Sequence, residues 1–478
     1  MSQGPAQSTQ LPSSFRDPAG FVFKHNNAVH RLITAAGLAD FDALHGSGLY
    51  DALVTRGMLV AHEEVHAPLI EPGLERQASK VILPEQVPYV SYPYEWSFSQ
   101  LKAAALLTLE VQKLALDHDM SLKDASAYNI QFVGVRPIFI DTLSFLPLQA
   151  DQPWVAYKQF CEHFLGPLAL MSCVDIGLNK LAVSYLDGVP LQMVVSMLPR
   201  RTWFNYAYLT HLHLHARSQS RHANAAATSG QVKQARMSKR MLYALNESLL
   251  NAVRRCVAKD LHTEWSHYYE DTNYSLQAMD AKARQIDLWL GQHVAPGSVV
   301  HDVGANTGYF SAIAAQHAEL VVAHDIDMFA VDKHFNALSK EGGENNASQQ
   351  NILPVHLDFC NPSPALGWGG MERESLFDRC GTGTVMALAL VHHLAIGNNT
   401  PLAAISEQFA RLGDKLIIEF VPKGDSQVDR LLASRPDIFP EYTQAGFERA
   451  FAQHFQQLDA AAVEGSSRRL YLFKRISG

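Results

Sequence analysis

The chain has 478 residues, 18% of them charged and 47% hydrophobic, which is enough for two or three globular domains. Its formal net charge of −8 gives no general attraction to nucleic acid, and the five cysteines form no C-x-x-C pair that would indicate a structural zinc site. The N-terminus lacks a secretory signal pattern and no apolar run could cross a membrane, so we expect a soluble, cytoplasmic protein.

The first half of the chain combines short strands with longer helices. Residues 1–16 are polar and predict a disordered tail, whereas the apolar spacing of residues 98–119 predicts a long amphipathic helix. In chain order, the other expected elements are strands at residues 21–24 and 29–33, a helix at 40–56, strands at 130–133 and 137–140, and helices over 154–216. This mixture indicates an α+β domain over residues 17–217.

The composition changes after this domain. Residues 218–236 are small and polar and predict an exposed linker. Residues 237–292 predict helices that lead into a second domain, which we expect to span residues 237–478. From residue 298 onward strands alternate with helices, which is typical of an α/β fold with a parallel sheet wrapped by helices.

A glycine turn follows the first strand of this second domain. The β-branched strand 299–303 ends in Gly304-Ala305-Asn306-Thr307-Gly308, and a helix begins at Tyr309. Glycines allow a ligand to approach the backbone closely, but the G-x-x-x-G spacing differs from the G-x-G-x-x-G of dinucleotide-binding folds. The next strand, 320–324, ends in Asp325-Ile326-Asp327. An acid about 20 residues beyond the glycines suits the hydroxyls of a nucleoside ribose.

Polar residues also follow the later strands. Strand 352–357 ends in Asp358-Phe359, strand 385–390 ends in His392-His393, and strand 416–421 contains Glu419. A last strand at 470–475 can close the sheet. Because the carboxyl ends of parallel strands meet at one edge of a sheet, these side chains are candidates for a common site.

The run H-D-V-G-A-N-T-G-Y-F-S, together with D-I-D, resembles the first two motifs of class I S-adenosylmethionine (SAM)-dependent methyltransferases. The resemblance covers residues 282–475 and implies a Rossmann-like, seven-stranded domain. It implies that Asp302 lies near the methionine amino group, that Asp325 binds the ribose and that Asp358 and Phe359 contact the adenine. Gly304, Asn306 and Gly308 would line the methionine and ribose side. The alternatives are a related domain that binds another nucleotide, or one that binds nothing.

Three residues near the expected methyl acceptor are candidates for catalysis. His392 or His393 could remove a proton from a hydroxyl or amine, since a histidine with a near-neutral pKa suits general base catalysis. Glu419 could bind the acceptor. A helix-capping or purely structural role is the alternative for each of them. The segment A-L-A-L-V-H-H-L lacks an N-P-P-Y or D-P-P-Y signature, which disfavours an adenine or amide-nitrogen acceptor of the DNA type.

The first domain resembles protein-kinase-like phosphotransferases at three positions. Asp124, Asn129 and Asp141 match the spacing of the family's catalytic and metal-binding residues, which implies ATP and magnesium as ligands. The departures are substantial: no His-Arg precedes Asp124, Thr142-Leu143 replaces Phe-Gly, and no glycine-rich loop is evident. Arg31 and Lys80 are the candidates for the family's strand lysine. A kinase-like fold without phosphotransfer and a chance match are the alternatives.

A kinase-like half followed by a methyltransferase half resembles a bacterial group of SAM methyltransferases related to nodulation protein NoeA. We therefore expect methyl transfer to a small-molecule, glycan or other hydroxyl-bearing acceptor, with the first domain recruiting the substrate or regulating the reaction. One alternative is a bifunctional enzyme that phosphorylates and methylates its acceptor. Another is a non-catalytic interaction protein. No metal site is expected in the second domain.

Overall fold

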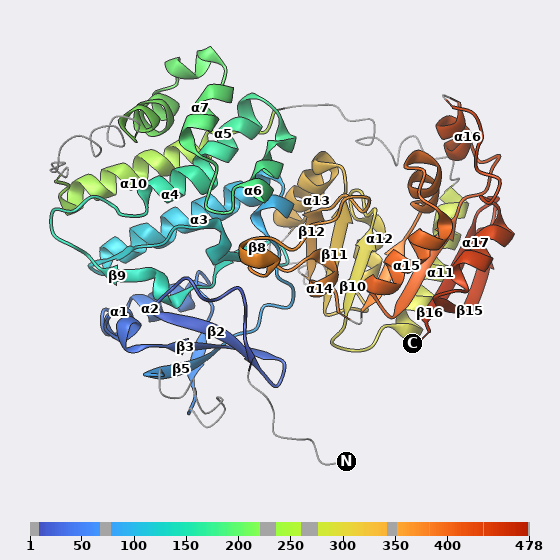
Figure 1. Cartoon of the computed structure of the whole chain (residues 1–478), viewed down its shortest axis with the longest axis horizontal. Coiled ribbons are helices and arrows are strands. Elements are labelled where there is room, and N and C mark those ends of the chain that lie inside the picture. Colours follow the sequence, from blue (N-terminus) through green and yellow to red (C-terminus); the bar gives the residue numbers. More distant parts are fainter. Residues whose placement is uncertain are drawn as a thin grey trace. The chain divides into compact units, whose positions relative to one another are not determined.

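The computed structural model describes residues 9–66, 78–219, 236–259, 276–341, 351–381, 383–433 and 435–476, which form two compact units (Figure 1). Unit 1 comprises residues 1–132, 136–260 and 366–373, and unit 2 comprises residues 133–135, 261–365 and 374–478. Most of the expected linker, residues 220–235, lies outside the described residues.

Unit 1 begins with a five-stranded antiparallel sheet in the order β1-β2-β3-β5-β4. Its strands are β1 (Thr9–Gln10), β2 (Gly20–His25), β3 (Ala28–Ile33), β4 (His62–Glu64) and β5 (Lys80–Pro84). The predicted hairpin is confirmed: β2 and β3 pair across Asn26 and Asn27, which both have positive φ. The predicted disordered tail is wrong for residues 9–16, because Thr9 and Gln10 pair with the edge of β2.

The rest of unit 1 is mainly helical. Its long helix α3 (Phe98–Asp117) confirms the amphipathic pattern and begins at a capping box formed by Ser97 and Gln100. The other elements are α1 (Ala35–Gly46), α2 (Leu49–Thr55), η2 (Pro93–Glu95), β6 (Met120–Leu122), η3 (Ala127–Asn129), β7 (Ile130–Val133), β8 (Arg136–Phe139), η4 (Thr142–Ser144), β9 (Phe145–Pro147), α4 (Tyr157–Phe160), η5 (Cys161–Leu165), α5 (Gly166–Cys173), η6 (Ile176–Lys180), α6 (Leu181–Ser184), α7 (Leu191–Met197), η7 (Arg200–Phe204), α8 (Tyr206–Tyr208) and η8 (Leu209–Leu214).

Helix α10 (Lys239–Arg254) also belongs to unit 1, so the prediction that residues 237–259 lead into the second domain is wrong. The helix packs against α3: the Asn246 side-chain amide donates to the carbonyl oxygen of Leu109 (3.1 Å), and Lys102 Nζ donates to the carbonyl oxygen of Arg254 (2.9 Å). The apolar face of α10 is buried against unit 1, because an amphipathic helix is stabilised when its apolar side is removed from water.

Unit 2 contains the expected seven-stranded sheet, in the order β12-β11-β10-β13-β14-β16-β15. The five strands from β12 to β14 are parallel, and β16 and β15 are antiparallel. The strands are β10 (Val299–Val303), β11 (Leu320–Asp325), β12 (Ile352–His356), β13 (Thr384–Ala387), β14 (Lys415–Phe420), β15 (Phe455–Ala462) and β16 (Arg469–Arg475). Strand β15 was not predicted, because its polar, largely exposed residues show no apolar alternation.

Helices cover both faces of this sheet (Figure 1). Successive side chains of β16 point to opposite faces: Leu470 and Leu472 join the core cluster that contains α11 residues, while Phe473 contacts Phe447 and Phe451 of α17. The helices of unit 2 are α11 (Leu276–His293), α12 (Tyr309–Ala314), α13 (Met328–Glu341), α14 (Leu376–Arg379), η11 (His393–Gly397), α15 (Leu402–Leu412), α16 (Ser426–Leu432) and α17 (Gln444–Phe451), and η10 (Trp368–Gly370) lies in the segment assigned to unit 1.

Two buried ion pairs fix the elements around the carboxyl edge of the sheet. Lys282 of α11 lies 2.6 Å from Glu419 of β14, and these side chains are 2% and 0% exposed. Arg468, just before β16, makes a two-pronged contact with Asp425 at 2.7 and 3.1 Å, and its Nη1 lies 4.0 Å from Glu419 Oε1. The four groups form a continuous chain of alternating charge that ties a helix, two strands and a loop together.

We expect Lys282→Met to lower the free energy of unfolding by about 3–5 kcal/mol, because the buried carboxylate of Glu419 loses its nearest cation and keeps Arg468 at 4.0 Å. The double variant Lys282→Met/Glu419→Leu should recover most of this loss, since it removes both charges. Chemical unfolding of the full chain measures both effects. The control Arg449→Met breaks an exposed pair with Glu441 and should change stability by less than about 1 kcal/mol. A loss from Lys282→Met as small as the control's would contradict a stabilising role for the pair.

Candidate cofactor and catalytic site

The glycine turn after β10 is held against the neighbouring strand β11. The backbone N–H groups of Gly304 and Ala305 both donate to the carbonyl oxygen of His324, at 2.8 and 2.9 Å. Gly308 has a φ of 87°, and a Cβ there would lie 2.0 Å from His334 Nε2. Only glycine fits at this position, so the turn can pass closely over α13 into the start of α12.

Asp325 ends β11 directly beside this turn. One carboxylate oxygen accepts from the backbone N–H of Asn306 (2.7 Å), and the other accepts from the N–H of Asp327 (2.8 Å). Burial raises the pKa of Asp325 to about 6, against the lowering effect of these two donors. Asn306 and Asp325, which were both predicted as cofactor residues, are thus brought into direct contact, and the carboxylate is oriented by the backbone.

Asp302, at the end of β10, is 2% exposed and accepts a hydrogen bond from Ser311 of α12 at 2.6 Å. Burial raises its pKa to about 7, while Ser311 and the charge of Lys282 act in the opposite direction. Neither Ser311 nor Lys282 was predicted as a site residue. Ser311 lies in the same G-x-x-x-G-Y-F-S run and could have been found from its place on the first turn of α12.

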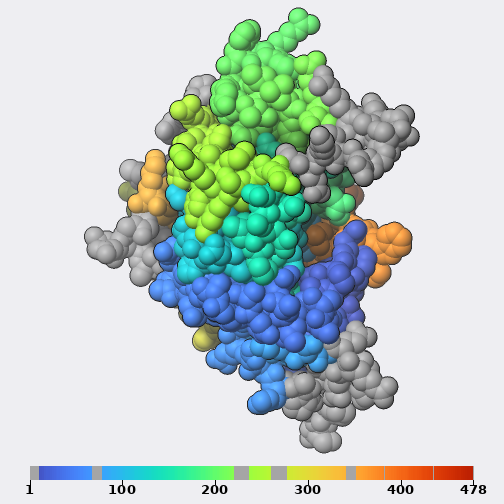
Figure 2. All heavy atoms as spheres, turned by 90° about the vertical axis from the view of Figure 1, so that its left-hand side faces the viewer, coloured from blue at the N-terminus to red at the C-terminus, as the bar shows by residue number. Residues whose placement is uncertain are grey.

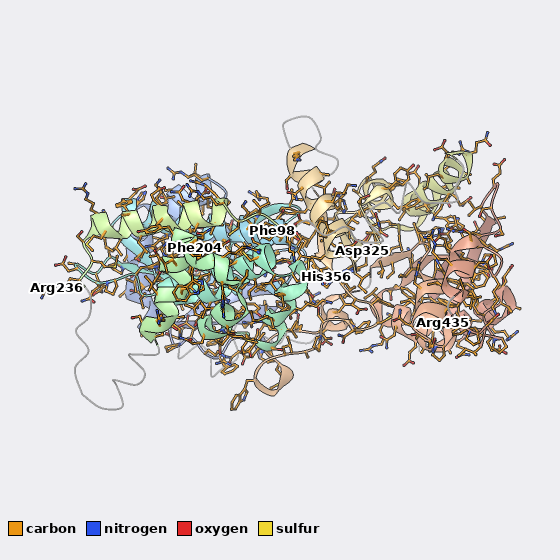
Figure 3. All side chains as sticks on the ribbon, turned by 90° about the horizontal axis from the view of Figure 1, so that it is seen from above. Phe98, Phe204, Arg236, Asp325, His356 and Arg435 are labelled. Carbon is orange, nitrogen blue, oxygen red and sulfur yellow. The ribbon has the colours of Figure 1, made fainter. Side chains whose placement is uncertain are left out.

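The end of β12 lies next to Asp325, as Figure 3 shows for His356, the register partner of Asp325. The N–H of Leu357 donates to the carbonyl oxygen of Asp325 at 2.8 Å. Asp358 accepts from the N–H of Cys360 at 2.9 Å, and the ring of Phe359 stacks on Phe409 with centroids 4.8 Å apart. Asp358 and Phe359 are both half-buried at the end of β12, and their contacts with an adenine stay a prediction.

Ile326 supplies an apolar surface at this place that the sequence did not reveal. It is 56% exposed although both of its neighbours, Asp325 and Asp327, are buried. An exposed branched side chain between two buried acids is suited to cover the flat face of a base whose ribose is held by Asp325.

His392 and His393 follow β13, with ring centroids 4.1 Å apart. His392 is fully buried, and neither of its ring nitrogens has a hydrogen-bond partner among the described residues. Its pKa lies well below the ordinary value because of burial and the nearby charges of His393, Arg468 and Lys282. Burial lowers the pKa of His393 to about 4. Both rings are therefore neutral at pH 7, and the same low pKa values make them weak bases.

Glu419 does not have the role expected from the sequence. Its carboxylate is fully buried and paired with Lys282, so it holds α11 against the sheet and is not available to an acceptor. The two cations near it, Lys282 and Arg468, were missed because they lie far from Glu419 in the sequence, at positions that no local motif marks.

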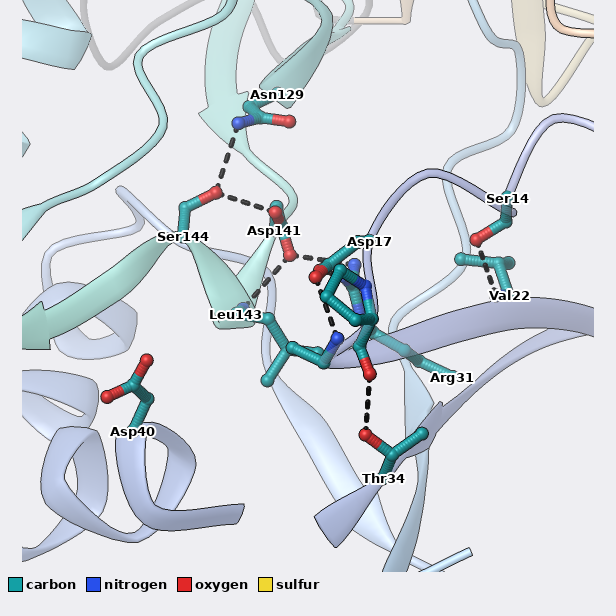
Figure 4. Close-up of polar contacts among 12 residues, drawn as sticks. Ser14, Asp17, Val22, Arg31, Thr34, Asp40, Asn129, Asp141, Leu143 and Ser144 are labelled. Atoms are coloured by element: carbon teal, nitrogen blue, oxygen red, sulfur yellow. Dashed lines mark hydrogen bonds and ion pairs between the residues drawn. The ribbon is translucent and has the colours of Figure 1, made fainter. Parts of the chain in front are cut away.

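In unit 1 the structure brings Asn129 and Asp141 of the kinase-like pattern together through Ser144 (Figure 4). Asn129 Nδ2 donates to Ser144 Oγ (3.0 Å), which donates to Asp141 Oδ2 (2.6 Å). Arg31 of β3 lies 2.7 Å from the other carboxylate oxygen of Asp141. Both oxygens of Asp141 are thus engaged by this chain's own donors, in the place where a metal ligand was expected.

Asp124 completes this cluster. Burial raises its pKa, and its Oδ1 accepts from the N–H of Ser126 (2.9 Å) and from Gln159 (2.8 Å). Lys80, the other candidate for the strand lysine, pairs with Glu64 (2.9 Å) and Asp42 (3.1 Å). Arg31, not Lys80, is therefore the cation that reaches the polar cluster.

Across the described ranges, no three histidine, cysteine, aspartate or glutamate side chains are placed to hold a metal ion. No described helix is both long enough and apolar enough to span a bilayer.

No family model matches the chain. Among solved structures, magnesium protoporphyrin IX methyltransferase (ChlM) from Synechocystis PCC 6803 with bound SAH is 19% identical and covers 44% of this chain and 93% of its own, with a TM-score of 0.30. N-methyltransferase NodS from Bradyrhizobium japonicum WM9 in complex with S-adenosyl-L-homocysteine (SAH) is 11% identical and covers 45% of this chain and 94% of its own, with a TM-score of 0.31.

A relative aligns over almost the whole length. The nodulation protein NoeA of Rhizobium meliloti (strain 1021) is 36% identical over 471 residues, which are 98% of this chain and 96% of that protein. Both units are included in the match. The chain therefore belongs to the family of nodulation protein NoeA.

Proposed function

We propose that unit 2 is a SAM-dependent methyltransferase whose acceptor is a small molecule or glycan that carries a hydroxyl group. The observation that carries this proposal is the contact of the Asp325 carboxylate with the glycine turn, at the carboxyl edge of the parallel sheet. An oriented carboxylate and an open backbone turn at this edge suit a nucleoside with a free ribose.

The residues at this edge fit SAM. Gly304 is exposed and leaves the backbone of the turn accessible, Asp325 can accept from the ribose hydroxyls, and Ile326 offers an apolar surface for the adenine. Bound SAM would supply an electrophilic methyl group. The main tasks of the protein are then to position the acceptor and to exclude water.

His392 is the group best suited to take the proton of the acceptor hydroxyl. It is neutral at pH 7, and its ring nitrogens are not engaged by other side chains among the described residues. Burial and the charges of Lys282 and Arg468 also make His392 a weak base, so it would take the proton only while the methyl group is transferred, when the acceptor hydroxyl becomes strongly acidic. In this transfer the acceptor oxygen would bond to the methyl carbon as the bond from that carbon to the sulfonium sulfur breaks and S-adenosylhomocysteine leaves, and a ring nitrogen of His392 would take the proton that the oxygen loses.

The first prediction concerns cofactor binding. Asp325→Ala should weaken the binding of SAH by about 30- to 1000-fold, because it removes about 2–4 kcal/mol of charged hydrogen bonding. Isothermal titration calorimetry on the full chain measures the dissociation constant. The control Asp287→Ala removes an exposed acid that pairs with His317 and should leave SAH binding unchanged. Micromolar binding that survives Asp325→Ala would refute the assignment of the site.

The same site should show a specific pH dependence. The ribose hydroxyls favour the ionised carboxylate, so protonation of Asp325, whose pKa is about 6, opposes binding. Affinity for SAH should be constant above pH 7 and fall toward tenfold per pH unit below about 6. In Asp325→Asn the weaker binding that remains should lose this pH dependence. An identical pH profile in Asp325→Asn would assign the titration to another group.

The next prediction concerns catalysis. Incubation with tritiated SAM and fractionated polar metabolites should label an acceptor fraction, and His392→Gln should reduce kcat on that fraction by about 10²- to 10⁴-fold. Binding of SAH should remain within about twofold of wild type. The matched control His454→Gln changes a histidine distant in sequence from the site. Full activity of His392→Gln would show that His392 does not act as the base.

For unit 1 the geometry favours recruitment or regulation over phosphotransfer. The Arg31–Asp141 ion pair places a guanidinium where a magnesium ion would need the carboxylate. A cation fixed in the chain balances the charge of Asp141 but cannot bridge phosphate oxygens as a free metal ion does. The bifunctional alternative would require this pair to open.

We therefore expect ATP with Mg²⁺ to leave the melting temperature of the full chain unchanged. A ligand at about 100 times its Kd would add about 2.7 kcal/mol, which differential scanning fluorimetry detects easily. SAH serves as the positive control. A Mg²⁺-dependent stabilisation by ATP that disappears in Asp141→Asn would instead support the bifunctional enzyme.

A further inference from the structure

Unit 1 carries a group of exposed aromatic and cationic side chains that none of the sites above uses. We call it the aromatic–cationic surface and define it as Arg200, Arg201, Trp203, Phe204, Tyr206 and Arg217. Phe204 is 92% exposed, Tyr206 77% and Trp203 41%. The segment lies at the surface, among the bright green atoms of Figure 2, and Figure 3 labels Phe204. Three large aromatic side chains within four positions are unusual on a surface in water.

The local structure holds these rings outward. Thr202 and Tyr208 are buried, and Thr202 Oγ1 lies within hydrogen-bond distance of His213 Nε2 (2.9 Å). Trp203 stacks on His213 with centroids 4.2 Å apart, and the guanidinium of Arg217 lies 5.6 Å from its ring centroid. Because Thr202 and Tyr208 anchor the segment from within, the rings between them are presented on a rigid support.

Asn205, the polar residue between the exposed aromatic residues, makes hydrogen bonds within its own segment. Asn205 Oδ1 accepts from the backbone N–H groups of Ala207 and Tyr208, at 3.0 and 3.2 Å, and so caps the short helix α8. Binding a glycan needs outward hydrogen-bonding groups beside the aromatic rings. Here the outward hydrogen-bonding groups beside the rings are mainly guanidinium groups, whose positive charge favours an anionic partner over a neutral one.

The charge of this surface is opposite to that of the chain as a whole, which carries −8. Arg201 reaches the carbonyl oxygen of Cys173 (3.3 Å), and Lys259 reaches that of Val174 (2.8 Å), so a further cation lies beside the arginines. The neighbouring acid Asp175 is exposed and caps the η6 turn through the N–H of Gly177. The cations outnumber it, and the surface is complementary to an anionic partner.

We propose that the aromatic–cationic surface binds peripherally to an anionic lipid bilayer. Tryptophan and tyrosine favour the level of the lipid headgroups, a protruding phenylalanine can enter the acyl boundary, and arginines pair with lipid phosphates. The partner is a membrane surface and not a span. This inference does not rest on methyltransferase activity, since it concerns residues of unit 1 only.

The test is sedimentation of the full chain with vesicles of phosphatidylcholine alone or mixed with phosphatidylglycerol. We expect binding to the anionic vesicles, with much weaker binding to the neutral ones. Phe204→Ala should weaken binding by at least about tenfold, and Arg200→Ala/Arg201→Ala by about fivefold for each charge removed. Raised salt should weaken binding of wild type further.

Two control variants each remove an exposed side chain from unit 2. Ile438→Ala and Arg430→Ala should leave vesicle binding unchanged, and SAH affinity should be the same in all variants if they fold. Equal binding to neutral and anionic vesicles, or an equal effect of the controls, would overturn the proposal. Self-association of the chain that Phe204→Ala abolishes, without vesicle binding, would overturn it in favour of a second copy as the partner.

Discussion

The carboxylate of Glu419 has no contact with solvent, and the arrangement of unit 2 around the carboxyl edge of its sheet depends on the charges that compensate it. Lys282 supplies the nearest one from α11, and Arg468 links it to Asp425. A buried ion pair usually contributes no more to the free energy of folding than an apolar pair of similar volume would. Its retention here is best explained by what the cations do for their other neighbours, Asp302 and His392.

The glycine turn and Asp325 form the second constraint, and it is made by the backbone. The N–H of Asn306 in the turn and the N–H of Asp327 donate to the carboxylate before any ligand binds, and Gly308 lets the turn pass over His334 without a clash. A carboxylate already oriented loses little conformational freedom when it binds ribose hydroxyls. Preorganisation of this kind also explains why burial can raise the pKa of Asp325 only to about 6, since the two donors favour its ionised form.

The sequence predicted the parts of this architecture that are set locally. The strand, glycine turn and helix from β10 to α12 follow from β-branching and glycine positions, and α3 follows from its apolar spacing and its cap. Partners distant in sequence could not be predicted. An amphipathic α10 needs an apolar face to cover, but its sequence does not say whether that face belongs to unit 1 or unit 2. Likewise, nothing near Glu419 in the sequence indicates that Lys282 and Arg468 lie beside it. Its place at the end of a strand therefore suggested that it binds the acceptor.

The same long-range chain of charges connects fold and chemistry. If Lys282 and Arg468 merely balanced Glu419 and Asp425, their influence on His392 would be incidental. Under the proposed role, His392 has to be neutral before it takes a proton, and burial together with two fixed cations favours this form while it also lowers the basicity of the ring. Both cations are themselves held by buried carboxylates, so they cannot turn to pair with an acceptor. The ion pairs therefore hold α11 and β14 together at the carboxyl edge of the sheet, and their cations add to the effect of burial in keeping His392 neutral.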